Sequence, residues 1–290
     1  MAILLCWLGL ACMQVLAQET FKGFGAVQTH LSSRPVHIVA IHPHNVSSFT
    51  EGLLFDGGHL LESTGLNGQS FIREIDPVTS LYTGKEFQFP DSVFGEGIAV
   101  VDDTIYALTY VSQRGFAIDR KTFALVREFA FATTTGEGWG MTTDGTLLIV
   151  SDGSAVLLFF DPATMREVRR VTVALHGEPV ANINELEYVH GEVFANVWFT
   201  TQILRIDAAT GRVKEVLELA QLPFLEGHKD AIADPARKAD AVMNGIAHNP
   251  SNNHLYITGK MWDAVFELDV VLAPAAAKTH LRRIHGQVIR

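Results

Sequence analysis

One short motif recurs at nearly constant spacing through the middle of the chain. An apolar residue, an aspartate, two further residues and a threonine stand together four times, with the aspartates at Asp76, Asp119, Asp161 and Asp207. The intervals between them are 43, 42 and 46 residues. Fixed periods of this size are typical of repeat architectures, and the blades of a β-propeller are the nearest match. An aspartate that ends a strand and is followed by threonine also predicts a side-chain-capped turn.

Each period contains four short apolar or alternating runs, separated by polar or glycine-containing turns. In the second repeat the runs are 97–101, 104–109, 115–119 and 123–129. Such runs predict antiparallel strands joined in a meander. Repeats begin near Gly52, Gly97, Gly140, Leu186 and Gly245, so the chain is expected to be all-β and to form a five-bladed β-propeller over residues 36–271.

The fifth repeat has only three evident strands, at 245–248, 254–258 and 264–270. We expect residues 36–41 to supply the missing outermost strand, because a borrowed strand closes the ring and covers an exposed sheet edge. The longer interval before the fifth repeat, 219–242, is interpreted as a surface loop with a helical turn.

The first 17 residues are apolar and end in Val15-Leu16-Ala17, a small-residue pattern that predicts a signal peptide, although its usual positive charge is missing. Cys12 offers a weaker, lipoprotein interpretation. An N-terminal arm (18–35) and a basic tail (272–290) are expected to flank the propeller. Both cysteines lie inside the predicted signal, so the mature chain has no disulfide or cysteine chemistry. The expected location is secreted or periplasmic.

The net charge of the chain limits the classes of binding partner that are expected. The formal net charge is −10, from 22 basic and 32 acidic residues, which argues against nucleic acid and anionic membranes. The 12 histidines form no HExxH motif, and His42-Pro43-His44 is only a weak metal signal. We expect no metal, no cofactor, no membrane span and a monomer.

In an antiparallel meander, the start of strand one and the end of strand two meet at the same end of the blade. The residues expected there are Glu51, Glu96, Trp139, Glu185 and Asn244 before strand one, and Gly65, Tyr110, Asp152, Trp198 and Lys260 after strand two. A purely structural repeat would tend to reuse one residue type at equivalent positions of its blades. Here acids, indoles, an amide and an ammonium occupy these positions, which predicts a binding or catalytic site. Glycines on both sides of Glu96 leave room to shield this acid and raise its pKa toward the range useful for proton transfer.

Each residue also has a structural interpretation. The two tryptophans could be packing residues, and Asn184 and Asn244 could satisfy buried backbone. Lys260 could be a solvated charge on the rim, and Glu185 and Glu187 a solvated pair. Taken jointly, the residues at this mouth favour a site.

Several motifs occur in the order found in one enzyme family. They are Phe49-Thr-Glu-Gly52, Glu62-Ser-Thr-Gly65, Phe94-Gly-Glu-Gly97, Gly115-Phe116 with Asp119-Arg120, Gly136-Glu-Gly-Trp-Gly140, Asn184-Glu-Leu-Glu-Tyr188, Ala195-Asn-Val-Trp198, Asn244-Gly-Ile246 and Thr258-Gly-Lys260. Across residues 36–270 the chain therefore resembles the plant and bacterial type of glutaminyl cyclase, a five-bladed propeller.

The resemblance implies conversion of the N-terminal glutamine of peptides or proteins into pyroglutamate, with loss of ammonia and without metal. It makes Glu96 the proton-transfer residue. Asn184 and Lys260 would bind the substrate amide and its oxyanion. The expected substrate-binding residues are Phe49, Glu51, Phe94, Tyr110, Trp139, Trp198 and Asn244. Glu51 stands where the family usually has glutamine, and Tyr110 where it usually has tryptophan.

Two other functions fit the sequence: a propeller that binds peptides without turnover, and a lactonase-like hydrolase that would gather ligands around a central metal.

We also expect the charges of Glu51 and Glu96 to oppose each other's ionisation if both face the channel mouth. The alternative is that Glu51 points into a loop or solvent.

Overall fold

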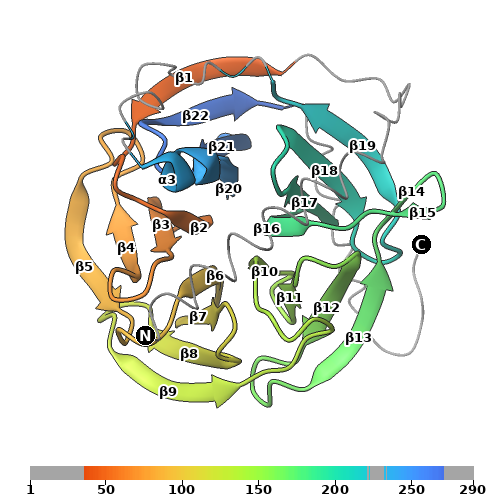
Figure 1. Ribbon diagram of the computed structural model, residues 1–290, viewed down its shortest axis with the longest axis horizontal. Helices are drawn as coiled ribbons and strands as arrows, with labels where there is room; N and C mark the ends of the chain where they lie inside the picture. The colour runs from red at the N-terminus through yellow and green to blue at the C-terminus, as the bar shows by residue number, and fades with distance from the viewer. Residues whose placement is uncertain (1–35, 221, 223–231, 233, 271–290) are drawn as a thin grey trace, which may run out of the picture. The chain divides into compact units, whose positions relative to one another are not determined.

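Five four-stranded antiparallel sheets surround a common axis in a computed structural model of the chain (Figure 1). The structure describes residues 36–220, 222, 232 and 234–270. The predicted signal, the N-terminal arm and the basic tail lie outside the described residues, as does most of the long loop. The five-bladed propeller predicted from the repeats is confirmed.

The strands follow the chain in order around the ring. Blade 1 contains β2 (Thr50–Asp56), β3 (His59–Thr64), β4 (Phe71–Ile75) and β5 (Tyr82–Gln88). Blade 2 contains β6 (Gly95–Val101), β7 (Thr104–Thr109), β8 (Arg114–Asp119) and β9 (Leu125–Ala130). Blade 3 contains β10 (Met141–Thr143), β11 (Leu148–Val150), β12 (Val156–Phe160) and β13 (Glu167–Thr172), and is followed by a small hairpin of β14 (Ala174–Leu175) and β15 (Glu178–Pro179).

The last two blades complete the ring. Blade 4 contains β16 (Ile183–Val189), β17 (Glu192–Val197), β18 (Gln202–Asp207) and β19 (Val213–Glu218). Blade 5 contains β20 (Met243–Asn249), β21 (His254–Gly259), β22 (Ala264–Asp269) and, as its outermost strand, β1 (His37–Pro43). The strands β2, β6, β10, β16 and β20 are the innermost, and buried apolar clusters fill the space between neighbouring blades.

The ring is closed by β1, as the sequence predicts. This strand pairs antiparallel with β22, from His37 opposite Asp269 to Pro43 opposite Ala264. The observed strand continues two residues beyond the predicted end at Ile41. The first described strand is thereby hydrogen-bonded to the last, and the edge of β22 is covered.

Four of the innermost strands contain a bulge near their first residue. In β2 the register shifts between Thr50 and Gly52, and equivalent shifts occur in β6, β16 and β20. A bulge adds a residue to one strand and re-aims its side chain. The extra residues include Glu51, Glu96 and Asn244. The sequence placed these residues just before strand one, but they lie inside it, at the bulges.

Glycines beside the bulges let neighbouring blades touch through their backbones. A Cβ atom on Gly97 would lie 2.3 Å from the backbone nitrogen of Met141. On Gly140 it would lie 2.2 Å from the carbonyl oxygen of Asn184. The Gly97 N–H also donates to the Trp139 carbonyl at 2.8 Å. Gly97 therefore brings Glu96 close to the next blade, and the space beside this glycine is filled by the backbone of that blade.

The repeated Asp-x-x-Thr motif forms the predicted turn between the third and fourth strands of blades 1 to 4. In blade 2, Asp119 accepts hydrogen bonds from the Thr122 backbone and hydroxyl, each at 2.8 Å. The same contacts occur at Asp76, Asp161 and Asp207. These hydrogen bonds hold the pKa of each of the four aspartates below its usual range.

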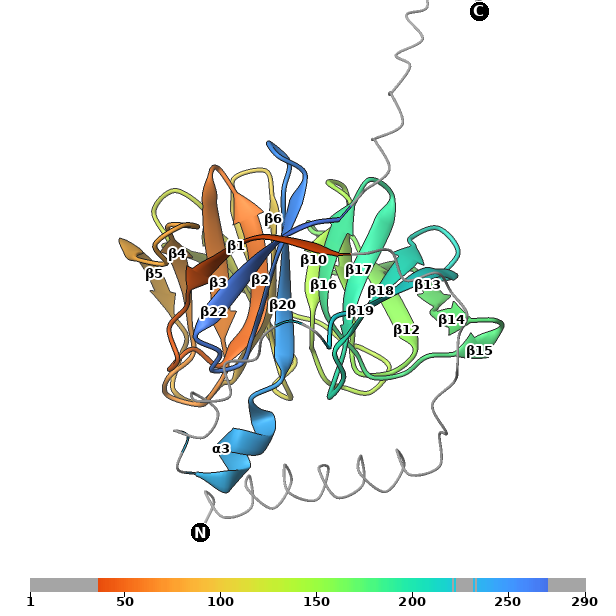
Figure 2. The ribbon, with the colours of Figure 1, turned by 90° about the horizontal axis from the view of Figure 1, so that it is seen from above.

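A short helix, α3 (Pro235–Asp240), precedes β20 and lies at the end of the ring where β20 begins (Figure 2). The helical turn expected between residues 219 and 242 is thus present. None of the helices in the described ranges is long and apolar enough to cross a membrane.

Candidate active site

A buried ion pair joins the first and last blades at one end of the channel. The Lys260 ammonium, just after β21, lies 2.7 Å from Glu51 Oε1 in the bulge of β2. Glu51 is 2% exposed and Lys260 7%. Asn244 Nδ2 donates to Glu51 Oε2 at 3.2 Å and to the Thr50 carbonyl at 3.0 Å. Glu51 therefore faces the channel mouth, and the alternative that it points into a loop or solvent is wrong.

Glu96 lies beside this pair. Its side chain is 5% exposed, and its backbone carbonyl accepts a 2.6 Å hydrogen bond from Ser63 Oγ, which fixes the bulge of β6. Burial raises the pKa of Glu96 well above its usual range, and the charge of Glu51 raises it further. Lys260 partly opposes both effects. Burial likewise raises the pKa of Glu51 to about 7, against the lowering by Lys260. The charge of Glu51 thus opposes the ionisation of Glu96, as expected, and Lys260 adds an ammonium to the pair.

Aromatic rings surround the charged groups. Phe49 packs edge-on against Phe94 with ring centroids 6.0 Å apart, and Phe94 lies 6.0 Å from Tyr110. The Lys260 ammonium lies 4.7 Å from the centre of the Phe49 ring, within the range of a cation–π contact. Trp139 and Trp198 form a second, edge-on pair with ring centroids 5.2 Å apart. The structure thus brings together the aromatic residues predicted for the pocket.

Two buried amides keep an acceptor without a partner. Asn184 is 3% exposed and Asn244 fully buried, and the Oδ1 atom of each has no hydrogen-bond partner within the described part of the chain. A buried acceptor without a partner is costly and calls for an explanation. A substrate that carries N–H groups into the pocket would supply the missing donors.

Glu137 also belongs to the site, although the sequence interpretation did not select it. Its carboxylate accepts a 2.9 Å hydrogen bond from Trp139 Nε1 and a further one from the Tyr110 hydroxyl. Burial, followed by the charge of Glu137, raises the pKa of Tyr110 above its usual range. The charge of Glu137 also contributes to the raised pKa of Glu96. This carboxylate ties together pocket walls from blades 2 and 3.

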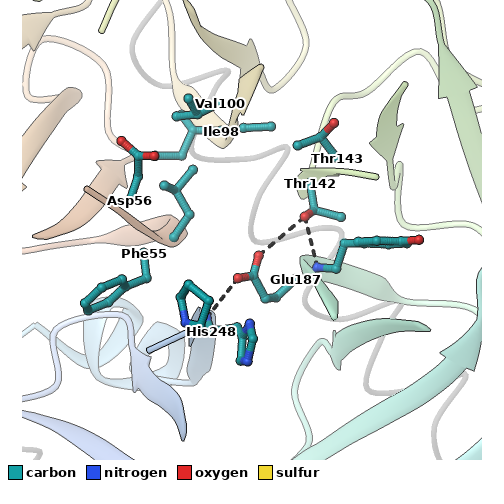
Figure 3. A pocket seen from close by; sticks show the side chains of 12 residues that line it. Phe55, Asp56, Ile98, Val100, Thr142, Thr143, Glu187 and His248 are labelled. Atoms are coloured by element: carbon teal, nitrogen blue, oxygen red, sulfur yellow. Dashed lines mark hydrogen bonds between the residues drawn. The ribbon is translucent and has the colours of Figure 1, made fainter. Parts of the chain in front are cut away.

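Glu185 and Glu187 face other parts of the channel. Glu185 is 1% exposed and accepts hydrogen bonds from the backbone N–H groups of Leu53 and Ile246, at 3.1 and 2.7 Å. It therefore joins blades 1, 4 and 5, and the interpretation of these glutamates as a solvated pair is wrong for Glu185. Glu187 lies between Thr142 and the backbone of His248 and lines a cavity of about 220 Å³ near the opposite ends of the inner strands (Figure 3).

A buried histidine supports the loop that carries Phe49. His44 Nε2 contacts Glu62 Oε1 at 2.8 Å, and His44 Nδ1 contacts the Trp262 carbonyl at 2.8 Å. Glu62 also accepts hydrogen bonds from Ser48 and Thr50. Burial disfavours both charges, but the mutual attraction and hydrogen bonds outweigh it, raising the pKa of His44 and lowering that of Glu62. His44 of the His-Pro-His motif thus packs beside the site, whereas His42 pairs with Glu267 on β22.

The His44–Glu62 pair should stabilise the fold most strongly within a limited pH range. The contribution of His44 is fully present below its ordinary pKa of 6.5 and is lost as the pH rises through the folded-state value. The contribution of Glu62 is present above 4.5 and is lost as the pH falls through its lowered folded-state value. The pair should stabilise most between pH 4.5 and 6.5. Glu62→Gln should lower the free energy of unfolding there by about 1–3 kcal/mol.

Urea denaturation at pH 5.5 and 8.5 measures this effect. Glu128→Gln is a matched control, because Glu128 pairs with Arg114 at the surface, where both side chains are more than 40% exposed and a salt bridge contributes little. A Glu62→Gln protein that loses the same stability at both pH values would contradict the assignment of a charged pair.

Buried titratable groups gathered at one pocket are typical of enzymes. The fold and this cluster together define a propeller of the enzyme class, with a candidate site at one end of its inner strands. Comparison with known proteins gives the family: the chain belongs to the glutamine cyclotransferase family, whose model matches residues 7–270.

Two relatives support the assignment. A glutaminyl-peptide cyclotransferase of Arabidopsis thaliana is 32% identical over 252 residues, which cover 86% of this chain and 75% of the relative. The crystal structure of Myxococcus xanthus glutaminyl cyclase superposes with a TM-score of 0.72 at 32% identity, covering 81% of this chain and 95% of that one.

Proposed function

We propose that this chain converts the N-terminal glutamine of peptides and proteins into pyroglutamate and releases ammonia, with Glu96 as the proton shuttle. Family membership and both relatives support the cyclotransferase activity. The observation that carries the mechanism is the buried Glu96 beside the Glu51–Lys260 pair, under aromatic walls.

The reaction forms one bond and breaks another. The α-amine nitrogen of the glutamine attacks its own side-chain amide carbon, and the bond from that carbon to the amide nitrogen then breaks. An α-amine has a pKa of about 8, so much of it is neutral at mildly alkaline pH. Glu96 takes the proton that the amine loses and delivers it to the departing nitrogen, which leaves as ammonia. A carboxyl whose pKa is raised holds a proton more readily than an ordinary glutamate, which suits a group that must both accept and donate one.

The tetrahedral intermediate carries its negative charge on the former amide oxygen. Lys260 has three N–H donors and uses one toward Glu51, so the others can face this oxygen. The acceptor oxygens of Asn184 and Asn244 suit the N–H groups of the amine and the amide. The aromatic walls hold the aliphatic part of the glutamine and exclude water.

The test measures ammonia release from a Gln-Ala amide with a coupled assay, in the presence and in the absence of a chelator. The matched control is the same peptide with its α-amine acetylated, which removes the nucleophile. We expect ammonia only from the free peptide, unchanged by the chelator. Release from both peptides would indicate a deamidating hydrolase. Binding without turnover would favour a peptide-binding propeller, and loss of activity with chelator would favour a metal enzyme of the lactonase-like kind.

Glu51→Gln should move the pH profile of kcat/KM. This substitution restores the residue that is usual in the family and removes a charge that raises the pKa of Glu96. It also leaves the charge of Lys260 less compensated, which lowers the pKa of Glu96 further. The limb of the profile that belongs to the enzyme should therefore shift to lower pH. Superimposable profiles would show that Glu51 and Glu96 are not coupled.

The predicted signal at residues 1–17 and the net charge of −10 complete the proposal. The chain would act in the secretory pathway or the periplasm, on peptides and proteins that expose an N-terminal glutamine. Mass spectrometry of the secreted chain tests the first part, because cleavage after Ala17 leaves Gln18 as the first residue.

A further inference from the structure

A tight turn beside the aromatic residues of the candidate site carries an exposed phenylalanine. After β17 ends at Val197, the chain turns through Trp198 and Phe199, and the Val197 carbonyl accepts hydrogen bonds from the backbone and hydroxyl of Thr200, at 3.1 and 2.8 Å. Phe199 is 37% exposed and has a φ of 62°. The third position of such a turn favours glycine or asparagine, because a positive φ is strained for a bulky side chain.

The ring of Phe199 continues the aromatic wall of the pocket outward. It lies 4.4 Å from the Trp198 ring, at an angle of 49°. Trp198 in turn packs against Trp139, whose indole is held by Glu137. Three rings thus run in contact from the buried Trp139 to the exposed Phe199. Trp198 and Phe199 are called here the rim pair.

In the equivalent turn of blade 5, the residue that corresponds to Phe199 is buried. Met261 follows Lys260 as Phe199 follows Trp198, and it also has a positive φ, of 57°. Met261 is only 5% exposed, because it packs against Phe49 and Ala241. Packing explains the apolar residue at Met261. At Phe199 the backbone is strained while the ring stays partly exposed, and backbone strain of this kind clusters at active sites and ligand-binding positions.

We propose that the rim pair is a subsite for an apolar or aromatic side chain on the second residue of the peptide, directly after the glutamine. This inference rests on the proposed function. When the glutamine side chain and α-amine lie among Trp139, Glu96 and Lys260, the peptide leaves the pocket across its rim. The next Cα atom is only about 3.8 Å further along. A ring on that residue can stack on Phe199 in an offset or edge-on geometry.

The test compares two peptides that differ only in this side chain, Gln-Phe amide and Gln-Ala amide. The wild type should favour Gln-Phe amide in kcat/KM by about 5- to 30-fold, the effect of burying one aromatic side chain against another. Phe199→Asn removes the ring and suits the positive φ, so the variant should fold. Its preference should fall to within about twofold, through loss of activity on the Phe peptide alone. Phe199→Tyr keeps the ring and should keep the preference.

The matched control is Val111→Ala. Val111 follows Tyr110 on blade 2 as Phe199 follows Trp198, and it is 63% exposed. This variant should leave the preference unchanged. A wild type without preference, or a Phe199→Asn variant that loses activity equally on both peptides, would overturn the subsite.

A binding measurement separates failure of the subsite from failure of the proposed function. The affinities of the pyroglutamyl-Phe and pyroglutamyl-Ala amides are measured by calorimetry for the wild type and Phe199→Asn. If neither glutamine peptide is turned over, the proposed activity is wrong, and a Phe preference that disappears with the ring would still support the subsite. Equal affinities for the two amides would overturn it.

Discussion

Glu96→Gln should lower kcat for a glutamine peptide by about 10²- to 10⁴-fold while the propeller stays folded. The substitution keeps the shape of the side chain but removes the carboxylate that we propose carries a proton from the α-amine to the departing nitrogen. The melting temperature should not fall, because the carboxylate is buried and its pKa is already raised. A neutral amide at this position is no harder to bury.

Two further variants make this result specific. Glu96→Asp keeps a carboxylate but withdraws it by one methylene, so an intermediate loss is expected if the distance to the substrate matters. Glu178→Gln changes an exposed glutamate on β15 and should have no effect. A folded Glu96→Gln protein that keeps most of its turnover would remove Glu96 from the mechanism.

Lys260→Met should remove about 3–4 kcal/mol of transition-state stabilisation and lower kcat/KM accordingly. The reason is that the proposed oxyanion donor is lost while an aliphatic side chain remains. Steady-state kinetics on the same glutamine peptide measure this loss. An increase in KM with kcat unchanged would instead assign Lys260 to substrate binding.

A second variant is needed because Lys260 is paired with Glu51, and Lys260→Met leaves Glu51 buried without this partner. The double variant Lys260→Met with Glu51→Gln removes both charges. We expect it to be as inactive as the single variant. Recovery of activity in the double variant would show that the unpaired carboxylate caused the loss, and that Lys260 does not stabilise the oxyanion.

The fold was predictable from the sequence because its information is local and repeated. The turn made by Asp119 and Thr122 requires only residues three positions apart, and its recurrence counts the blades. The closing strand was predictable because the fifth repeat lacks a member and an uncovered sheet edge is unfavourable. The rough positions of Glu96 and Lys260 followed from the strand pattern, whereas their roles rest on the family resemblance and stay predictions.

The pairings inside the site could not be predicted in the same way. Glu51 and Lys260 are joined through the closed ring, and the period of the strands does not say which side chains meet across it. The bulges were missed because the alternation of apolar residues continues on either side of them. Glu137 stands in a glycine-rich turn, where a glutamate looks solvent-exposed until the Tyr110 and Trp139 side chains are placed.

The pairing of β1 with β22 has a consequence for how the chain becomes active. The ion pair at the channel mouth joins residues 209 positions apart, and the His44 support of the site reaches Trp262 across 218 positions. Contacts of such high sequence separation form late, because a long loop must first lose its conformational freedom. In refolding from denaturant, recovery of cyclase turnover should therefore lag behind recovery of β-sheet signal in circular dichroism. Turnover would then report on the pairing of β1 with β22, the step that closes the ring.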